Sequence, residues 1–123
     1  MATIVDIDDT LLRNGTQPVQ RVIDYVNALP GSIIIVTGRN QSQRKETAAA
    51  LRRAGVKYSR LIMNPGSTSE TAKFKYEVGM RLRGSVNLAI DNNATMRAAY
   101  AKAGIKTKDP ATIPDMKKFW AIQ

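Results

Sequence analysis

Apolar runs and amphipathic stretches alternate along the chain. Short runs rich in β-branched residues predict buried strands, and apolar positions three and four residues apart predict helices. The predicted strands are residues 3–8, 32–36, 58–63, 86–90 and 105–107. The predicted helices are residues 18–29, 41–54, 69–83 and 93–103, with a candidate helical segment at 114–122. Residues 9–17 are expected to form a loop, and Asn64-Pro65-Gly66 a turn.

Strands and helices that alternate at these lengths predict a parallel sheet with helices on both faces. The expected fold class is therefore α/β, as a single Rossmann-like three-layer α/β/α domain with a mainly parallel sheet. Its core is expected over residues 3–107, followed by a C-terminal tail at 108–123. With 123 residues, the chain is large enough for one modest core and too short for two.

The first predicted strand ends in closely spaced carboxylates, within Ile4-Val5-Asp6-Ile7-Asp8-Asp9-Thr10-Leu11-Leu12. In open α/β sheets, ligands bind in the crevice at the carboxyl ends of the strands. Asp6 and Asp8 would point to the same side, because strand side chains alternate. Their mutual repulsion would be relieved by a bound divalent cation. The alternative is an Asp-rich turn that only caps the next segment.

The second predicted strand leads into Thr37-Gly38-Arg39. A threonine hydroxyl can donate to a phosphate oxygen, a glycine lets the backbone approach closely, and an arginine offers a planar fork that matches phosphate. The alternative is a strand end with a routine turn glycine and a solvated arginine.

The fourth predicted strand ends in Asp91, followed by Asn92-Asn93. This places a further acid at the same edge of the sheet as Asp6. The three residues also fit a helix N-cap, and Asp91 could serve both as a cap and as a ligand.

Composition limits the available chemistry. The chain has no cysteine and no histidine, so thiolate metal sites, disulfides and histidine bases are excluded. Its 19 Lys and Arg against 10 Asp and Glu give a net charge of +9, which favours polyanions or phosphorylated ligands unless the cations are only solvated. Neither a membrane-spanning segment nor a signal peptide is predicted, so a soluble, cytoplasmic protein is expected.

The run Asp6-Ile7-Asp8-Asp9-Thr10-Leu11 resembles the first motif of the haloacid dehalogenase-like (HAD) superfamily, most of whose members are magnesium-dependent phosphohydrolases. Thr37-Gly38-Arg39 is similar to the corresponding motif in the phosphatase domain of polynucleotide kinase-phosphatases. The resemblance spans roughly residues 3 to 107 and includes a helical lysine and the acid Asp91.

This resemblance implies roles for individual residues. Asp6 would be the nucleophile that forms an aspartyl phosphate, and Asp8 the general acid and base. Thr37 and Lys75 would bind the phosphoryl group, with Lys73 as the alternative lysine. The candidate substrate-binding residues are Thr10, Gly38, Arg39 and Arg13.

The resemblance also implies a Mg²⁺ site formed by Asp6, Asp91 and the main-chain carbonyl of Asp8. Many relatives carry a second acid beside the last aspartate, whereas this chain has Asn92. An amide can ligate magnesium or hold a metal-bound water, but it adds no charge. Weaker metal affinity, or loss of activity, is therefore open.

HAD specificity usually comes from a cap domain, and neither gap between the motifs has room for one. An open site and a net charge of +9 favour a phosphorylated nucleic-acid end (3′-phosphate) as substrate, with a nucleotide and then a phosphoprotein as alternatives. A separate kinase or ligase could be a partner. The cations expected to contact a phosphate backbone are Arg13, Arg44, Lys45, Arg52 and Arg53.

A second class of function stays open: a catalytically weak or inactive HAD-fold protein that binds nucleic acid or a protein partner through its basic surface. The segment Lys117-Lys118-Phe119-Trp120 is expected to dock on the sheet edge, with partner contact or base stacking as alternatives.

Overall fold

The structure, a computed structural model, describes residues 1–115. Its helices are α1 (Gln20–Asn27), α2 (Arg44–Arg53), α3 (Thr71–Leu82) and α4 (Ala94–Lys102). The main sheet contains β1 (Ala2–Val5), β4 (Ile33–Asn40), β5 (Arg60–Asn64), β6 (Val86–Ile90) and β7 (Thr107–Lys108). A separate hairpin pairs β2 (Leu12–Arg13) with β3 (Gln17–Pro18). Short 3₁₀ turns occupy Gln41–Gln43, Thr68–Glu70 and Pro110–Thr112.

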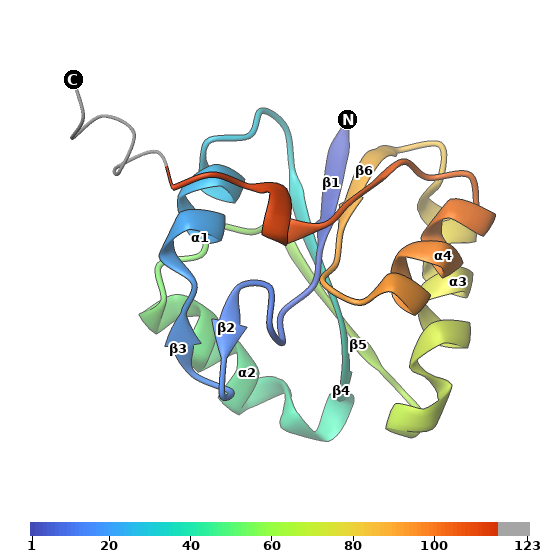
Figure 1. Cartoon of the computed structure of the whole chain (residues 1–123). Helices are drawn as coiled ribbons and strands as arrows, with labels where there is room; N and C mark the ends of the chain where they lie inside the picture. Colours follow the sequence, from blue (N-terminus) through green and yellow to red (C-terminus); the bar gives the residue numbers. More distant parts are fainter. Residues whose placement is uncertain (116–123) are drawn as a thin grey trace.

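The five strands of the main sheet lie in the order β5-β4-β1-β6-β7, and every neighbouring pair is parallel. Helices α1 and α2 cover one face of the sheet and α3 and α4 the other (Figure 1). The predicted class is confirmed: a single Rossmann-like α/β domain with a mostly parallel central sheet. Within residues 1–115, no cap is evident, because only the small β2–β3 hairpin and α1 lie between β1 and β4.

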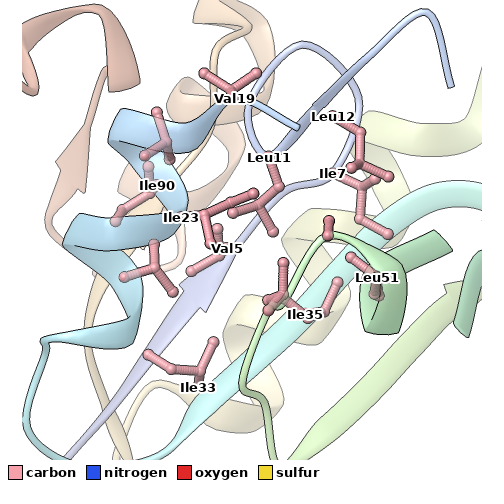
Figure 2. Close-up of a cluster of buried hydrophobic side chains, with 14 of the residues drawn as sticks. Val5, Ile7, Leu11, Leu12, Val19, Ile23, Ile33, Ile35, Leu51 and Ile90 are labelled. Carbon is pink, nitrogen blue, oxygen red and sulfur yellow. The ribbon is translucent and has the colours of Figure 1, made fainter. Parts of the chain in front are cut away.

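Alternation along the central strands builds two apolar cores. On one face, Val5 and Ile35 pack with residues of α1 and α2, as Figure 2 shows for Ile23 and Leu51. Ile4, one position earlier than Val5, packs instead with residues of α3 and α4. Strands buried on both faces explain the continuous apolar runs in the sequence.

The chain after β1 differs from its prediction. Strand β1 ends at Val5, three residues before the predicted end. The carbonyl of Ile7 accepts hydrogen bonds from the backbone N–H groups of Thr10, Leu11 and Leu12, which form a tight turn. The segment predicted as loop 9–17 then contains the β2–β3 hairpin, whose strands are only two residues long. Strands this short carry no alternating pattern that the sequence could reveal.

Other strand boundaries also differ from the prediction: β5 spans Arg60–Asn64, where residues 58–63 were predicted. Strand β4 continues past the predicted end at Val36 to Asn40, and β7 lies at Thr107–Lys108 instead of 105–107. The segment 116–123, with Lys117-Lys118-Phe119-Trp120 and most of the candidate helix 114–122, lies outside the described residues. No helix among the residues described is long and apolar enough to cross a membrane.

Candidate active site

The strand order places β1 between β4 and β6, so the carboxyl ends of these three strands are neighbours. Asp6 follows β1, Thr37 lies in β4 and Asp91 follows β6. All three residues are buried. The sequence-predicted groups from three distant parts of the chain therefore converge at one edge of the sheet, as expected for a parallel α/β fold.

Lys75 joins two of these carboxylates. From the second turn of α3, its Nζ donates to Asp6 Oδ1 at 2.9 Å and to Asp91 Oδ2 at 2.5 Å. The lysine is only 2% exposed, whereas Lys73 is exposed on the same helix. Of the two candidate lysines, the structure brings Lys75 into the site. A buried lysine between two carboxylates is a charge-compensated group, because neither sign could be buried cheaply alone.

Burial and the neighbouring charges both shift the pKa values of Asp6 and Lys75. Burial raises the pKa of Asp6 from 3.8 to about 6, and nearby Asp91 adds to the rise, while Lys75 opposes it. Burial alone would lower the pKa of Lys75, but the carboxylates of Asp6 and Asp91 outweigh it and raise that pKa. Asp6 is thus a more basic carboxylate than an exposed aspartate, held beside a fixed positive charge.

Asp8 is held by Arg39. The guanidinium forms a bidentate pair, with Nη2 2.7 Å from Asp8 Oδ1 and Nε 3.1 Å from Asp8 Oδ2. Arg39 Nη2 also donates to the carbonyl oxygen of Gly15 at 3.2 Å, and Nη1 to Thr47 Oγ1 at 3.3 Å. Arg39 therefore ties Asp8 to the β2–β3 hairpin and to α2. The Asp8 side chain is 52% exposed, so this carboxylate remains accessible from the cleft.

The irregular end of β4 explains how Arg39 reaches Asp8. Pairing between β4 and β5 is shifted between Thr37 and Asn40, and such irregularities redirect side chains at strand ends. The buried Oγ1 of Thr37 accepts a hydrogen bond from the Arg39 backbone N–H at 3.1 Å. The Thr37 hydroxyl stabilises this bend and still has its own hydrogen to donate.

Gly38 has a packing role. A Cβ at this position would come within 2.7 Å of the Thr71 side chain, at the first position of α3. The absence of a side chain at Gly38 lets the start of α3 approach β4, and Lys75 follows Thr71 by one helical turn. The close approach of Gly38 to Thr71 fixes how near the lysine-bearing helix lies to β4, and the expected role of Gly38 in substrate binding stays a prediction.

Thr10 and Asn92 complete the cluster around Asp6. The buried Thr10 Oγ1 donates to Asp6 Oδ2 at 3.0 Å and accepts from the Asn92 backbone N–H at 3.2 Å. The side-chain amide of Asn92 sets one polar atom 3.0 Å from Asp6 Oδ2 and 3.0 Å from the carbonyl oxygen of Asp8. With its nitrogen in that place, the amide donates to both oxygens. Thr10 thus holds the Asp6 carboxylate by a hydrogen bond and is itself buried, so it is not exposed to a substrate.

With the Asn92 amide oxygen turned inward, the spacing of these atoms can be compared with that of magnesium ligands. Oxygen ligands at 2.0–2.1 Å in an octahedron lie about 2.9 Å apart, close to the spacing between the Asn92 position and the oxygens of Asp6 and Asp8. Across residues 1–115, no group of three or more Asp, Glu, His or Cys side chains could hold a metal. The candidate metal ligands are therefore two carboxylates, a carbonyl and an amide, a type of oxygen set that magnesium binds. In this structure the Asp91 oxygens accept from Lys75 Nζ and from the Asn93 backbone N–H.

Most residues of this cluster line an open cleft of about 330 Å³, but the buried Thr10 and Thr37 are not part of its wall. Asp6, Asp8, Arg39, Lys75 and Asp91 all contribute to its wall. Arg13 does not line the cleft: it is exposed on β2, and the structure does not bring it to the other predicted residues. A hairpin between Asp8 and α1 was not predicted, so the direction of Arg13 could not be predicted either.

Several supporting residues could not be predicted from the sequence. Arg97 in α4 donates from Nη1 to the Asp91 carbonyl oxygen at 3.0 Å, and its Nη2 lies 3.6 Å from Asp109 Oδ2. The buried Asn64 donates to the carbonyl oxygen of Ser67 at 2.9 Å and shapes the turn before α3. We had interpreted Asn64 only as a turn residue, and no spacing marks Arg97 as a partner of Asp91.

Comparison with known proteins adds information about the fold. No protein-family model matches the sequence, and no curated protein sequence matches it. The structure is similar to a chain in a structure of the Pnkp1/Rnl/Hen1 RNA repair complex, with a TM-score of 0.65 and 19% identity over 88% of this chain. A chain in a structure of the Pnkp1/Rnl/Hen1 complex matches with a TM-score of 0.62 and 18% identity, also over 88%. This chain spans 41% and 45% of those two chains. At such identity, the likeness establishes the fold alone.

Proposed function

We propose that this domain is a HAD-type, magnesium-dependent phosphatase that acts through an aspartyl phosphate. The observation that carries the proposal is the buried Lys75, which bridges Asp6 and Asp91 at the floor of an open cleft. A charge-compensated cluster at the carboxyl edge of a parallel sheet is more than the fold needs for stability, because apolar residues would fill the same space at lower cost.

Asp6 is the proposed nucleophile. One of its oxygens forms a bond to phosphorus while the bond from phosphorus to the leaving oxygen breaks. Lys75 keeps the carboxylate ionised although burial raises its pKa to about 6, so the group is both charged and more basic than an exposed aspartate. Thr10 and Lys75 hold its two oxygens in place, which reduces the entropy lost on reaching the reactive geometry.

Asp8 is the proposed general acid and base. In its protonated form it gives a proton to the leaving oxygen, and as a carboxylate it then takes a proton from water. The oxygen of that water attacks phosphorus and releases phosphate and the Asp6 carboxylate. Because Arg39 holds Asp8 as an ion pair, Arg39 must leave Asp8 before the first step. The phosphoryl oxygens of a bound substrate offer Arg39 an alternative bidentate partner.

Asp6, Asp91, the Asp8 carbonyl and the Asn92 amide would hold the magnesium ion. When bound, this ion would neutralise charge on the phosphoryl oxygens. The chain's own cations, Lys75 and Arg39, lie on the cleft wall and would also neutralise charge on the phosphoryl oxygens.

The proposed substrate is a phosphorylated nucleic-acid end (3′-phosphate), or else a nucleotide. Support comes from the open cleft, from the net charge of +9 and from the structural likeness to a chain of an RNA repair complex. Protein partners in such processing, including a kinase or ligase, belong to the same proposal.

The alternative is a weak or inactive HAD-fold protein that binds nucleic acid or a protein. Asn92 favours this alternative, because it supplies a neutral amide beside Asp91 where many HAD enzymes have a second acid.

Phosphate release separates the two functions. A generic aryl phosphate and a 3′-phosphorylated oligonucleotide are each incubated with Mg²⁺ or with chelator. The phosphatase proposal expects Mg²⁺-dependent release from both, faster from the oligonucleotide. Folded protein that releases phosphate from neither substrate would favour the binding protein.

A further inference from the structure

The positive charge of the chain is concentrated at the amino ends of the strands, opposite the candidate active site. Besides the uncharged connection at residues 28–32, three connections return the chain to that end of the sheet, the end marked N in Figure 1. They lie within the segments 52–60, 81–85 and 102–106, which together contain no Asp or Glu. The first segment carries Arg52, Arg53, Lys57 and Arg60.

The other two segments continue the same surface. Arg81 and Arg83 lie at the end of α3, and Lys102 and Lys106 between the end of α4 and β7. We call these four cations, together with the four of segment 52–60, the amino-edge surface. All eight are exposed. Eight charges equal all but one of the chain's net charge of +9, so the remainder of the chain is nearly neutral.

Helix stability accounts for only part of this pattern. Cations in the last turn of a helix interact favourably with the helix dipole, which explains Arg52, Arg53, Arg81 and Lys102. The remaining four do not lie in a last helical turn. Within residues 1–115, none of the eight forms an ion pair. Unpaired like charges in neighbouring connections repel one another, and a bound polyanion relieves that repulsion.

Arg60 joins two hollows on this surface. One, of about 370 Å³, is lined by Arg60 together with Ser32, Ser59 and Ser85, each in the short segment before a strand. The other, of about 110 Å³, lies between Arg60 and Arg81. Guanidinium groups and serine hydroxyls are the side chains that contact phosphate and sugar oxygens in nucleic-acid complexes.

We propose that the amino-edge surface binds the phosphate backbone of a nucleic acid. A protein partner would need an apolar centre in its interface. Among residues 1–115 the one exposed large hydrophobic residue is Met1, which lines the larger hollow and is too small a patch for such a centre. Nucleic-acid interfaces are polar and strongly cationic, which this surface matches.

This binding goes beyond the proposed function. The two edges are separated by the length of a strand, about 16 Å for five residues. The amino-edge surface therefore holds a part of the nucleic acid that does not enter the cleft. Arg52 and Arg53, which we expected to contact a phosphate backbone, lie at the end of α2 on this edge, whereas α2 begins with Arg44 on the cleft side.

The test uses an oligonucleotide with hydroxyl groups at both ends, in chelator, so that neither phosphatase activity nor magnesium affects the result. Binding is measured by fluorescence anisotropy at several salt concentrations. One variant combines Lys57→Gln, Arg60→Gln, Arg81→Gln and Lys106→Gln. The matched control removes the same charge from exposed cations outside the amino-edge surface: Arg13→Gln, Arg44→Gln, Lys45→Gln and Lys73→Gln. Far-ultraviolet circular dichroism checks that both are folded.

The proposal expects the amino-edge variant to bind at least about tenfold more weakly at 0.1 M salt, with a salt slope lower by about 3, since each lost phosphate contact removes about 0.7. The control variant tests Arg13, Arg44 and Lys45, which were expected to contact a phosphate backbone, and the proposal expects it to lose clearly less affinity and slope than the amino-edge variant. Equal losses in both variants, a larger loss in the control, or wild-type protein that does not bind would overturn the proposal. Polyglutamate competing as well as an oligonucleotide of equal charge would also overturn it, in favour of an acidic protein partner.

Discussion

Lys75 Nζ lies 2.9 Å from Asp6 Oδ1, and this contact connects α3 to the end of β1 across 69 positions of sequence. Replacing the lysine with methionine leaves the buried Asp6 and Asp91 without their cation. We expect Lys75→Met to lower the free energy of unfolding by about 3–5 kcal/mol at pH 8.

The loss should be smaller at pH 5. Without Lys75, the pKa of Asp6 rises above its already raised value, so the folded state binds more protons than the unfolded state. Stability therefore falls as pH rises through this range. Urea unfolding in chelator measures both values, with the exposed Lys73→Met as control, expected within about 0.5 kcal/mol of wild type. A Lys75→Met variant as stable as wild type at pH 8 contradicts the account.

Arg39 offers a test of substrate binding. Because the Asp8 side chain is 52% exposed, the Arg39–Asp8 pair should contribute no more than about 1 kcal/mol to stability. Lysine cannot reproduce a bidentate contact with phosphate. We therefore expect Arg39→Lys to lower kcat/KM for an aryl phosphate by about 10- to 100-fold, the equivalent of one charged hydrogen bond, with little change in Tm. Unchanged kcat/KM would show that Arg39 only holds Asp8.

Asn92→Asp tests the proposed metal site. A carboxylate near Asp6 Oδ2 removes an amide donor and adds repulsion, so the metal-free variant should unfold at lower temperature than wild type. Mg²⁺ should bind at least about tenfold more tightly, the scale seen when groups around a metal change. Calorimetric titration of Mg²⁺ and the Mg²⁺-induced shift in Tm provide two readouts independent of activity.

Asn93→Asp is the matched control for that variant. Asn93 caps α4 by accepting from the backbone N–H groups of Thr95 and Met96, and aspartate caps equally well. This control adds the same charge one residue away while preserving the helix end. If both variants bind Mg²⁺ equally tightly, the side chain at position 92 is not part of the metal site.

The parallel sheet and part of the candidate site could be predicted from the sequence. The apolar runs and the acids at their ends predicted the parallel sheet, because buried strands and the carboxyl-end crevice leave patterns that repeat along the chain. The meeting of Asp6 with Asp91 follows from that topology alone. Lys75 could not be separated from Lys73 by periodicity, since both lie on an amphipathic helix and only packing decides which is buried.

Contacts made by irregular backbone were beyond prediction. The bend after Thr37 directs Arg39 onto Asp8, and the two-residue strands of the hairpin supply the Gly15 carbonyl that fixes it. Both features depend on local hydrogen bonds that no apolar pattern records. The catalytic roles, the magnesium ion and a cytoplasmic location remain predictions.

Tyr100 provides a test away from the cleft. Its hydroxyl is buried without a hydrogen-bond partner among residues 1–115, and burial, followed by the charges of Asp91 and Asp6, raises its pKa well above 10. Tyr100→Phe keeps the shape and removes the unsatisfied group. We expect stability equal to wild type or higher by up to about 2 kcal/mol.

The pKa of Tyr100 also gives the sign of a pH effect. The folded state retains the phenol proton that the unfolded state releases, so this residue's contribution to stability is complete below pH 10 and is lost as pH rises above it. Tyr100→Phe should therefore lose less stability than wild type between pH 9 and 11 in urea unfolding. A variant less stable than wild type by more than about 1 kcal/mol at pH 7 would mean that the hydroxyl has a partner.

The nucleophile is the central claim, and Asp6→Asn tests it most directly. Asp9→Asn is the matched comparison: Asp9 is exposed beside Asp8 with φ 59°, a left-handed conformation that asparagine also adopts. Release of phosphate from an aryl phosphate and a 3′-phosphorylated oligonucleotide is measured in Mg²⁺ for both variants, after circular dichroism has shown that they are folded. The account predicts that release falls to background in Asp6→Asn and continues in Asp9→Asn. Wild-type turnover that persists in folded Asp6→Asn would contradict it.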